Sequence, residues 1–149
     1  TSLTIDGVEV VIDSGKVRLP GHDVNRGINT LWIEKISRAS AEQRAGRAGR
    51  TAPGICCRLW TESDHAARPA FTEPEIRRLE LSELLLLTLS AGIGDPYQFA
   101  WFEAPPLKSL DNALQLLRGL GALPQDSYEP TTLGRAMADV PLHPRYARM

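Results

Sequence analysis

The residues best suited to chemistry lie at positions 43–50, where the chain reads QRAGRAGR. Three arginines within seven residues need either an anionic partner or open solvent around them. Positions i, i+4 and i+7 share one side of an α-helix, so a helix here places Gln43, Arg47 and Arg50 on one face. That face predicts a site for an anion. The alternative is a solvated basic helix that pairs with surface carboxylates.

Two glycines, Gly46 and Gly49, interrupt this segment. A glycine inside a helix costs about 1 kcal/mol relative to alanine, so two of them need a compensating reason such as close approach of another backbone. Ser40 followed by Gln43 has the spacing of a capping box, which predicts a helix over residues 41–50. A capping Gln43 would accept a hydrogen bond from the backbone N–H of Ser40 through its side-chain oxygen, and that role competes with any role in chemistry.

The elements around that segment alternate between strand and helix. The expected strands cover residues 8–12, 17–19, 30–33 and 55–60. The β-branched character of the first predicts a buried strand, and the second and third predict a hairpin whose long loop contains Pro20 and Gly21. Strand, hairpin, helix and strand in this order are typical of the last part of an α/β domain. We therefore expect residues 1–63 to be such a part, with the chain beginning inside the domain.

The second half of the chain is predicted to be mostly α-helical. The expected helices run from Pro74 to Gly92, from Leu110 to Leu120, and from Thr131 or Thr132 to just before Pro141. Residues 84–87 make the first of these apolar nearly all round, which predicts burial between neighbours. Gly121 is expected to close the second helix, and residues 123–129 to form a turn or wing. Helix, helix, wing and helix is the order of a winged-helix domain, which we place at residues 64–140.

Composition narrows the possible classes of protein. Of the 17 Lys and Arg and 18 Asp and Glu residues, nine basic and six acidic ones lie in residues 1–60, which leaves eight and twelve in residues 61–149. The chain has no charged and apolar leader and no apolar run of about 18 residues, so we expect a cytoplasmic protein without a membrane partner. Cys56 and Cys57 are adjacent and too close for an ordinary disulfide, and the few histidines assemble no zinc or other metal site.

Residues 43–50 match every specified position of the QRxGRxGR motif of DEAH-box helicases, and the chain resembles that family. Residues 1–7 resemble the end of the preceding family motif, and residues 11–15 fit its VxDSG pattern. The likeness covers essentially the whole chain and leans toward the bacterial HrpA/HrpB branch. It implies an α/β remnant of a RecA-like helicase C-terminal domain followed by a mostly α winged-helix domain. The implied domains are the end of the second RecA-like motor domain (1–63), the winged-helix domain (64–140) and the start of a helical, ratchet-like domain (141–149).

The resemblance implies roles for particular residues. Arg47 and Arg50 correspond to arginine fingers that neutralise charge on the γ-phosphate of ATP, and Gln43 corresponds to the residue that positions the attacking water. The residues matched to ATP binding are Ser2, Thr4 and Asp6, of which Asp6 is expected to hold the ribose. For Ser2 and Thr4 the alternative is an ordinary turn hydroxyl. The chain contains no GxxxxGK[ST] loop, so ATP and Mg²⁺ are expected in the full-length helicase and neither on this chain alone.

The predicted hairpin lies where the family has a hairpin that contacts nucleic acid. Its candidate contacts to the phosphates of RNA or DNA are Arg18, Arg26 and Lys35. The alternative is a solvated surface hairpin, because Asp23 and Glu34 dilute the basic charge. The resemblance implies two partners, single-stranded or duplex RNA or DNA and the first RecA-like domain of the same protein. A rival function is a winged-helix module that binds nucleic acid or protein without catalysis. The excess of acidic over basic residues in the second part of the chain argues against binding to a duplex.

Overall fold

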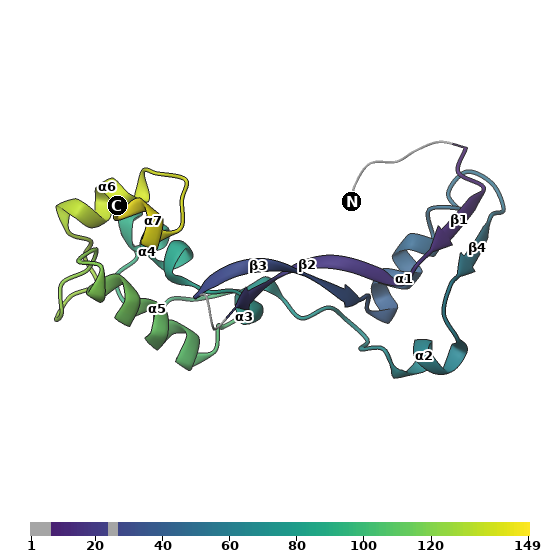
Figure 1. Cartoon of the computed structure of the whole chain (residues 1–149), viewed down its shortest axis with the longest axis horizontal. Coiled ribbons are helices and arrows are strands. Elements are labelled where there is room, and N and C mark those ends of the chain that lie inside the picture. Colours follow the sequence, from purple (N-terminus) through teal and green to yellow (C-terminus); the bar gives the residue numbers. More distant parts are fainter. Residues whose placement is uncertain (1–6, 24–26) are drawn as a thin grey trace. The chain divides into compact units, whose positions relative to one another are not determined.

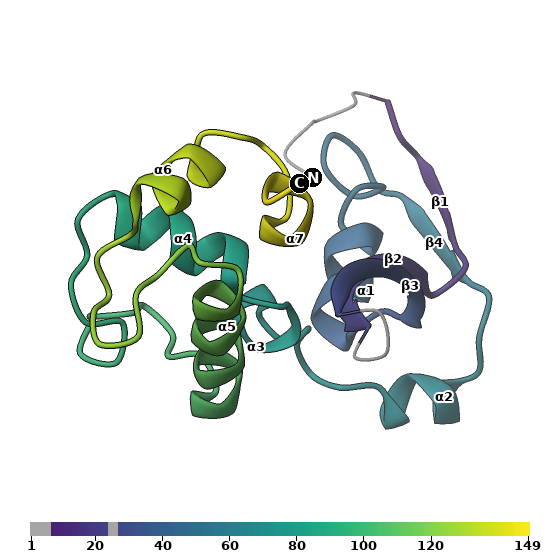
Figure 2. The same cartoon turned by 60° about the vertical axis from the view of Figure 1, so that its left-hand side comes forward.

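The computed structural model describes residues 7–23 and 27–149. The chain forms two compact units, whose elements are labelled in Figures 1 and 2. Unit 1 combines the residues up to Leu19 with Leu31–Glu73, and unit 2 combines Pro20–Thr30 with Pro74–Met149. No helix in the described part of the chain is long and apolar enough to cross a membrane.

The first sheet of unit 1 joins two strands that are distant in sequence. Strands β1 (Val10–Asp13) and β4 (Ile55–Arg58) pair in parallel, with Val10 opposite Ile55 and Asp13 opposite Arg58. The prediction of a buried first strand is wrong, because Val10 and Ile12 are 56% and 71% exposed. In the described residues this sheet has two strands, and helix α1 packs against β1, so one face of the sheet stays uncovered.

The hairpin contains longer strands than the sequence predicts. Strands β2 (Lys16–Asp23) and β3 (Ile28–Lys35) form the second two-stranded sheet, so Pro20 and Gly21 belong to a strand and not to the loop. Both strands of such a sheet are edges, where proline is tolerated because its missing N–H is not required by a second neighbour. The base of the hairpin belongs to unit 1, and residues Pro20–Thr30 belong to unit 2.

Helix α1 (Arg38–Ala45) begins and ends earlier than the sequence predicts. Its N-cap is Ser37, whose hydroxyl accepts a hydrogen bond of 3.2 Å from the backbone N–H of Ser40. The helix gives way after Ala45 to tight turns, in which the N–H of Arg47 donates to Arg44 and the N–H of Ala48 to Ala45. The predicted continuation to residue 50 is therefore wrong. Gly46 and Gly49 lie outside the helix and do not carry the cost of glycine in a helix interior.

Unit 1 continues beyond the boundary predicted at residues 63 and 64. Helix α2 (Glu62–Ala67) follows β4, and the chain after it remains attached to α1. The backbone N–H groups of Arg38 and Ala39 donate to the carbonyls of Pro69 and Ala70, at 2.9 and 3.0 Å. Because these bonds hold residues 68–70 to the start of α1, the compact units divide at Glu73.

Unit 2 is helical apart from the hairpin tip. Its helices are α3 (Glu75–Arg78), α4 (Ser82–Ser90), α5 (Leu107–Gly119), α6 (Thr132–Ala138) and α7 (Pro144–Ala147). On α5 the buried side chains are Leu110, Ala113, Leu114 and Leu117, which is the apolar stripe that the sequence predicts. They pack with Leu85 and Leu89 of α4 and Met137 of α6 in one core. Gly121, at φ +75°, follows the end of α5 as expected.

Two predictions for unit 2 need correction, and the prediction of a turn or wing at residues 123–129 is met by turns. The helix expected from Pro74 to Gly92 is divided into α3 and α4, because Glu80 accepts hydrogen bonds from the backbone and hydroxyl of Ser82 and starts a new helix there. Helix α4 is not buried all round, since Leu84 and Leu87 are 38% and 49% exposed. Residues 123–129 contain turns and no strand. The order of helices agrees with a winged-helix domain, and that assignment stays a prediction.

Candidate functional site

Gln43 lies on the last part of α1, and its side chain is exposed to solvent. The predicted capping box is wrong, because Ser37 caps the helix and Gln43 stands well inside it. An N–H group at the helix start, that of Ser40, therefore donates to the hydroxyl of Ser37 and not to Gln43. The competition between capping and chemistry that the sequence suggested does not arise.

Arg47 and Arg50 lie after the end of α1. Arg47 is half-buried in the turn that follows the helix, and Arg50 is exposed beyond it. The predicted common helical face with Gln43 is therefore wrong, since the helix stops at Ala45 before either arginine is reached. The three residues still follow one another along a single segment, in which Gln43 and Arg50 are exposed and Arg47 is half-buried. Its shape is set by tight turns and not by helical periodicity.

The turn between the two arginines is anchored through Ala48. This alanine is 2% exposed, and a β-carbon added to Gly54 would lie 2.2 Å from its carbonyl oxygen. The sequence predicted close backbone approach at Gly46 and Gly49. Gly49 has no neighbour within 4 Å and Gly46 has none closer than 3.4 Å, so the close approach is instead at Gly54. Residues 46–50, called the arginine turn below, are thus packed against the residue that precedes β4.

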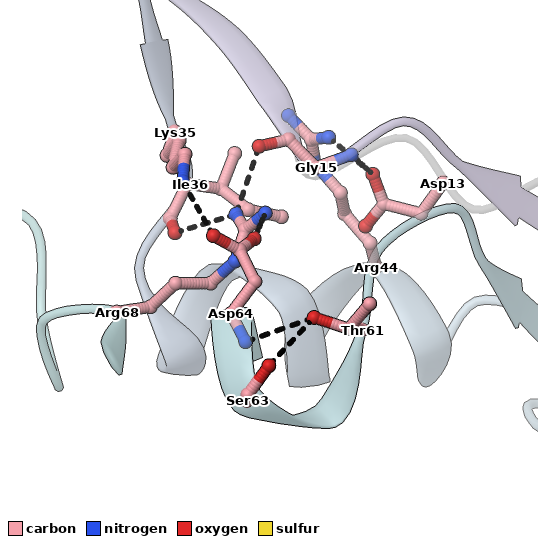
Figure 3. Close-up of polar contacts among 9 residues, drawn as sticks. All are labelled: Asp13, Gly15, Lys35, Ile36, Arg44, Thr61, Ser63, Asp64 and Arg68. Atoms are coloured by element: carbon pink, nitrogen blue, oxygen red, sulfur yellow. Dashed lines mark hydrogen bonds and ion pairs between the residues drawn. The ribbon is translucent and has the colours of Figure 1, made fainter. Parts of the chain in front are cut away.

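Arg44 holds the start of the hairpin through its side chain (Figure 3). Its Nη1 donates to Oδ1 of Asp13 at 2.8 Å, and both terminal nitrogens donate to the carbonyl oxygen of Lys16 at 3.2 and 3.1 Å. The Asp13 carboxylate is 1% exposed and also accepts from the N–H of Gly15 at 2.8 Å. Asp13 thus carries a buried charge that Arg44 neutralises.

Arg68 is the second arginine at the hairpin base, and no pattern in the sequence indicated it. It is 5% exposed, and its Nη1 donates to the carbonyls of Gly15 and Ile36 at 2.9 and 3.1 Å. Its Nη2 pairs with Asp64 at 2.8 Å, and its guanidinium lies 4.3 Å from the centre of the Trp60 ring. Figure 3 shows the contacts of Arg68 with Gly15 and Ile36, at the two ends of the hairpin, and with Asp64 of α2. Only the folded chain brings these groups together.

Asp64 also binds Lys35, one of the predicted phosphate contacts. Hydrogen bonds from Lys35 and then from Arg68 hold the pKa of the Asp64 carboxyl below its ordinary value. The Lys35 ammonium is therefore already paired within the protein. Arg18 is exposed on β2. The remaining predicted site residues, Ser2, Thr4, Asp6 and Arg26, lie outside the described residues.

Within residues 7–23 and 27–149 there is no group of three or more His, Cys, Asp or Glu side chains placed to hold a metal ion. Cys56 and Cys57 are free thiols on β4. The described site therefore offers cationic and amide groups suited to phosphate, and no metal-binding set accompanies them.

The chain was compared with known proteins. No family model matches it. It is 42% identical to the ATP-dependent RNA helicase HrpA of Escherichia coli, over 100% of this chain and 12% of HrpA. It is 48% identical to the human probable ATP-dependent RNA helicase DHX34, over 95% of this chain and 12% of that protein. The crystal structure of the Escherichia coli DEAH/RHA helicase HrpB superposes with a TM-score of 0.88 at 39% identity, over 99% of this chain and 19% of HrpB.

The chain is homologous to one region of the DEAH-box helicases. It spans about an eighth to a fifth of the length of these relatives, between 12% and 19%. HrpA is named as an ATP-dependent RNA helicase and DHX34 as a probable one. The resemblance drawn from the QRAGRAGR segment is thus confirmed by both sequence and fold. The roles of the individual motif residues stay predictions.

Proposed function

We propose that this chain forms part of an ATP-dependent RNA helicase and contributes one wall of its ATP site. The observation that carries the proposal is the QRAGRAGR segment, which is complete in sequence and has Gln43 and Arg50 exposed around the end of α1, in a chain homologous to DEAH-box helicases. The exposure of Arg50 supports the proposal because its guanidinium must reach a phosphate held by another domain. Packing of Ala48 against Gly54 supports it too, because a preorganised donor loses little freedom on binding.

In the proposed mechanism, the phosphates of ATP supply the anionic charge that this segment recognises. Arg47 and Arg50 donate hydrogen bonds to γ-phosphate oxygens and neutralise the charge that develops there during transfer. The amide of Gln43 orients the attacking water. The chain has no phosphate-binding GxxxxGK[ST] loop, so the first RecA-like domain of the full-length protein supplies the opposite wall. Asp6, Ser2 and Thr4 bind the nucleotide in the same proposal, and Mg²⁺ would be held by groups beyond the described residues.

The proposed nucleic-acid contacts lie on the hairpin. Arg18 and Arg26 would bind backbone phosphates, which gives affinity without sequence preference and with strong dependence on salt. Lys35 contributes less than the sequence suggests, because it is paired with Asp64. RNA is the proposed substrate, since HrpA and DHX34 are both named as RNA helicases. The domain assignment follows the same proposal, with a RecA-like part, a winged-helix part and the start of a ratchet-like domain.

Steady-state ATPase kinetics on the full-length protein test this proposal. Arg47→Ala and Arg50→Ala should each lower kcat by about 10³-fold or more, the scale of arginine fingers, while RNA affinity at fixed salt stays near the parental value. The matched control is Arg38→Ala, an exposed arginine on the first turn of the same helix, which should leave kcat unchanged. Parental hydrolysis combined with lost RNA affinity would identify the segment as a clamp on the RNA backbone and would refute the mechanism.

A further inference from the structure

Helix α1 is fastened to the hairpin at the end where the arginine turn begins. Arg44 is the last residue but one of α1, and Arg47 donates its N–H to the carbonyl of Arg44 at 3.1 Å. The side chain of Arg44 binds the carboxylate of Asp13 and the main-chain carbonyl of Lys16, the first residue of β2. One residue thus contacts the arginine turn through its backbone and the hairpin through its guanidinium.

The base of the hairpin is closed on its other side as well. The N–H of Ile36, just after β3, donates to the carbonyl of Gly15, just before β2, at 3.0 Å. Arg68, which is buried, donates to the carbonyls of Gly15 and Ile36. A displacement along either strand therefore reaches the base through fixed hydrogen bonds, because neither end of the hairpin is free to absorb it locally.

We propose that Arg44 is a positioning residue that couples the hairpin to the turn carrying Arg47 and Arg50. This inference rests on the proposed function, in which that turn faces ATP and the hairpin faces RNA. RNA engagement of the hairpin moves the carbonyl of Lys16, the guanidinium of Arg44 follows it, and the backbone of Arg44 resets the turn that begins at its carbonyl. Arg44 touches neither ATP nor RNA in this scheme.

An arginine suits this role for a geometric reason. Its planar guanidinium presents several N–H donors at fixed angles, so it binds the Asp13 carboxylate and the Lys16 carbonyl at the same time. A lysine ammonium is a point charge on a flexible stem, and it would keep the ion pair while losing the rigid link to the main chain. The buried Asp13 carboxylate keeps the arginine in place.

The chain provides a matched control in a second ion pair of the same helix. Arg58 of β4 binds Glu42 of α1 at 2.7 Å, and this pair is more exposed than the pair of Arg44 with Asp13. It also ties α1 to the first sheet but contacts no residue of the hairpin base in its described bonds. Loss of this pair tests the effect of loosening α1 without breaking the link to the hairpin.

The experiment uses the full-length protein with poly(U) RNA as the probe. The ratio of kcat at saturating RNA to kcat without RNA is measured for Arg44→Gln and Arg58→Gln, together with KM for ATP and Kd for RNA. Coupling free energies between sites commonly change affinity or response by about 5- to 150-fold. We expect the ratio to fall on that scale in Arg44→Gln, with KM and Kd near parental values, and to be retained in Arg58→Gln.

Two results would overturn the inference: an Arg44→Gln protein that keeps the parental ratio, or one in which both rates fall by the same factor. Should Arg44→Gln fail to fold, Arg44→Lys is assayed in the same way. A parental ratio in Arg44→Lys would likewise overturn the inference. The same turnover measurements are made on Arg47→Ala. Parental turnover in Arg47→Ala defeats the proposed function itself, whereas lost turnover there with an unchanged ratio in the Arg44 variant defeats only the coupling.

Discussion

Gly54 approaches Ala48 so closely that a β-carbon on Gly54 would lie 2.2 Å from the carbonyl oxygen and 2.5 Å from the carbonyl carbon of Ala48. These backbone atoms cannot move aside as the end of a flexible side chain can. Ala48 is buried and stands between Arg47 and Arg50. The position of both arginines therefore depends on a glycine that carries no functional group and lies outside the recognised motif.

Replacement of Gly54 tests this dependence. Gly54→Ala should push the turn away from β4 and, on the proposed function, lower the kcat of the full-length protein by about 100-fold, the scale of a misplacement near 1 Å. RNA affinity should not change. Gly94→Ala is the control, because a β-carbon there meets nothing within 4 Å. Steady-state kinetics with circular dichroism separate the outcomes, and parental turnover in a folded Gly54→Ala protein would show that the turn adapts.

Gly15 combines an unusual backbone conformation with crowding. Its φ is +70°, and an added β-carbon would lie 2.6 Å from Nη2 of Arg68 and 2.7 Å from Cε3 of Trp60. Gly15→Ala should lower the free energy of unfolding of unit 1 by about 1–3 kcal/mol through overpacking, in addition to backbone strain. Gly7→Ala isolates the strain, because Gly7 has φ +78° and open space around it. Urea unfolding curves that give equal losses for both variants would contradict the crowding.

The two ion pairs of α1 should differ in their contribution to stability. Arg44→Ala leaves the Asp13 carboxylate buried without its cation, which should cost about 3 kcal/mol. Arg58→Ala removes a pair whose Glu42 partner is 66% exposed, and should cost about 1 kcal/mol or less. Chemical denaturation of both variants measures the difference. Equal costs would mean that the Asp13 carboxylate finds another partner once Arg44 is removed.

Acid should weaken unit 1 through Asp64. Lys35 and Arg68 hold the pKa of Asp64 below its ordinary value of 3.8. A carboxyl with a depressed pKa adds stability above its unfolded pKa, and this contribution is lost as the pH falls from about 3.8 through the lower native pKa. Asp64→Asn should therefore show a smaller loss of stability across that range than the parent. Thermal melts at stepped pH measure this loss of stability. Asp126→Asn is the control, because Asp126 is an exposed residue in a turn of unit 2. Parallel pH curves for parent and Asp64→Asn would exclude the effect.

The sequence by itself determined what depends on local order along the chain. The stripe of buried leucines on α5 repeats with the helical period, and Gly121 follows the helix end, so this element was predicted closely. The family was recognised from the order of eight residues at 43–50, which requires no knowledge of contacts. The strand at β4 was recognised in the same way from its short apolar run.

The tertiary structure alone decided where α1 begins and ends and which arginines hold the hairpin. Ser37 rather than Ser40 caps α1, and the hydroxyl of Thr72 donates to Ser37 from far along the chain. Arg68 binds carbonyls that precede it by 53 and 32 residues. No local pattern marks such an arginine as buried, because the free energy that offsets its desolvation comes from acceptors that only folding gathers around it.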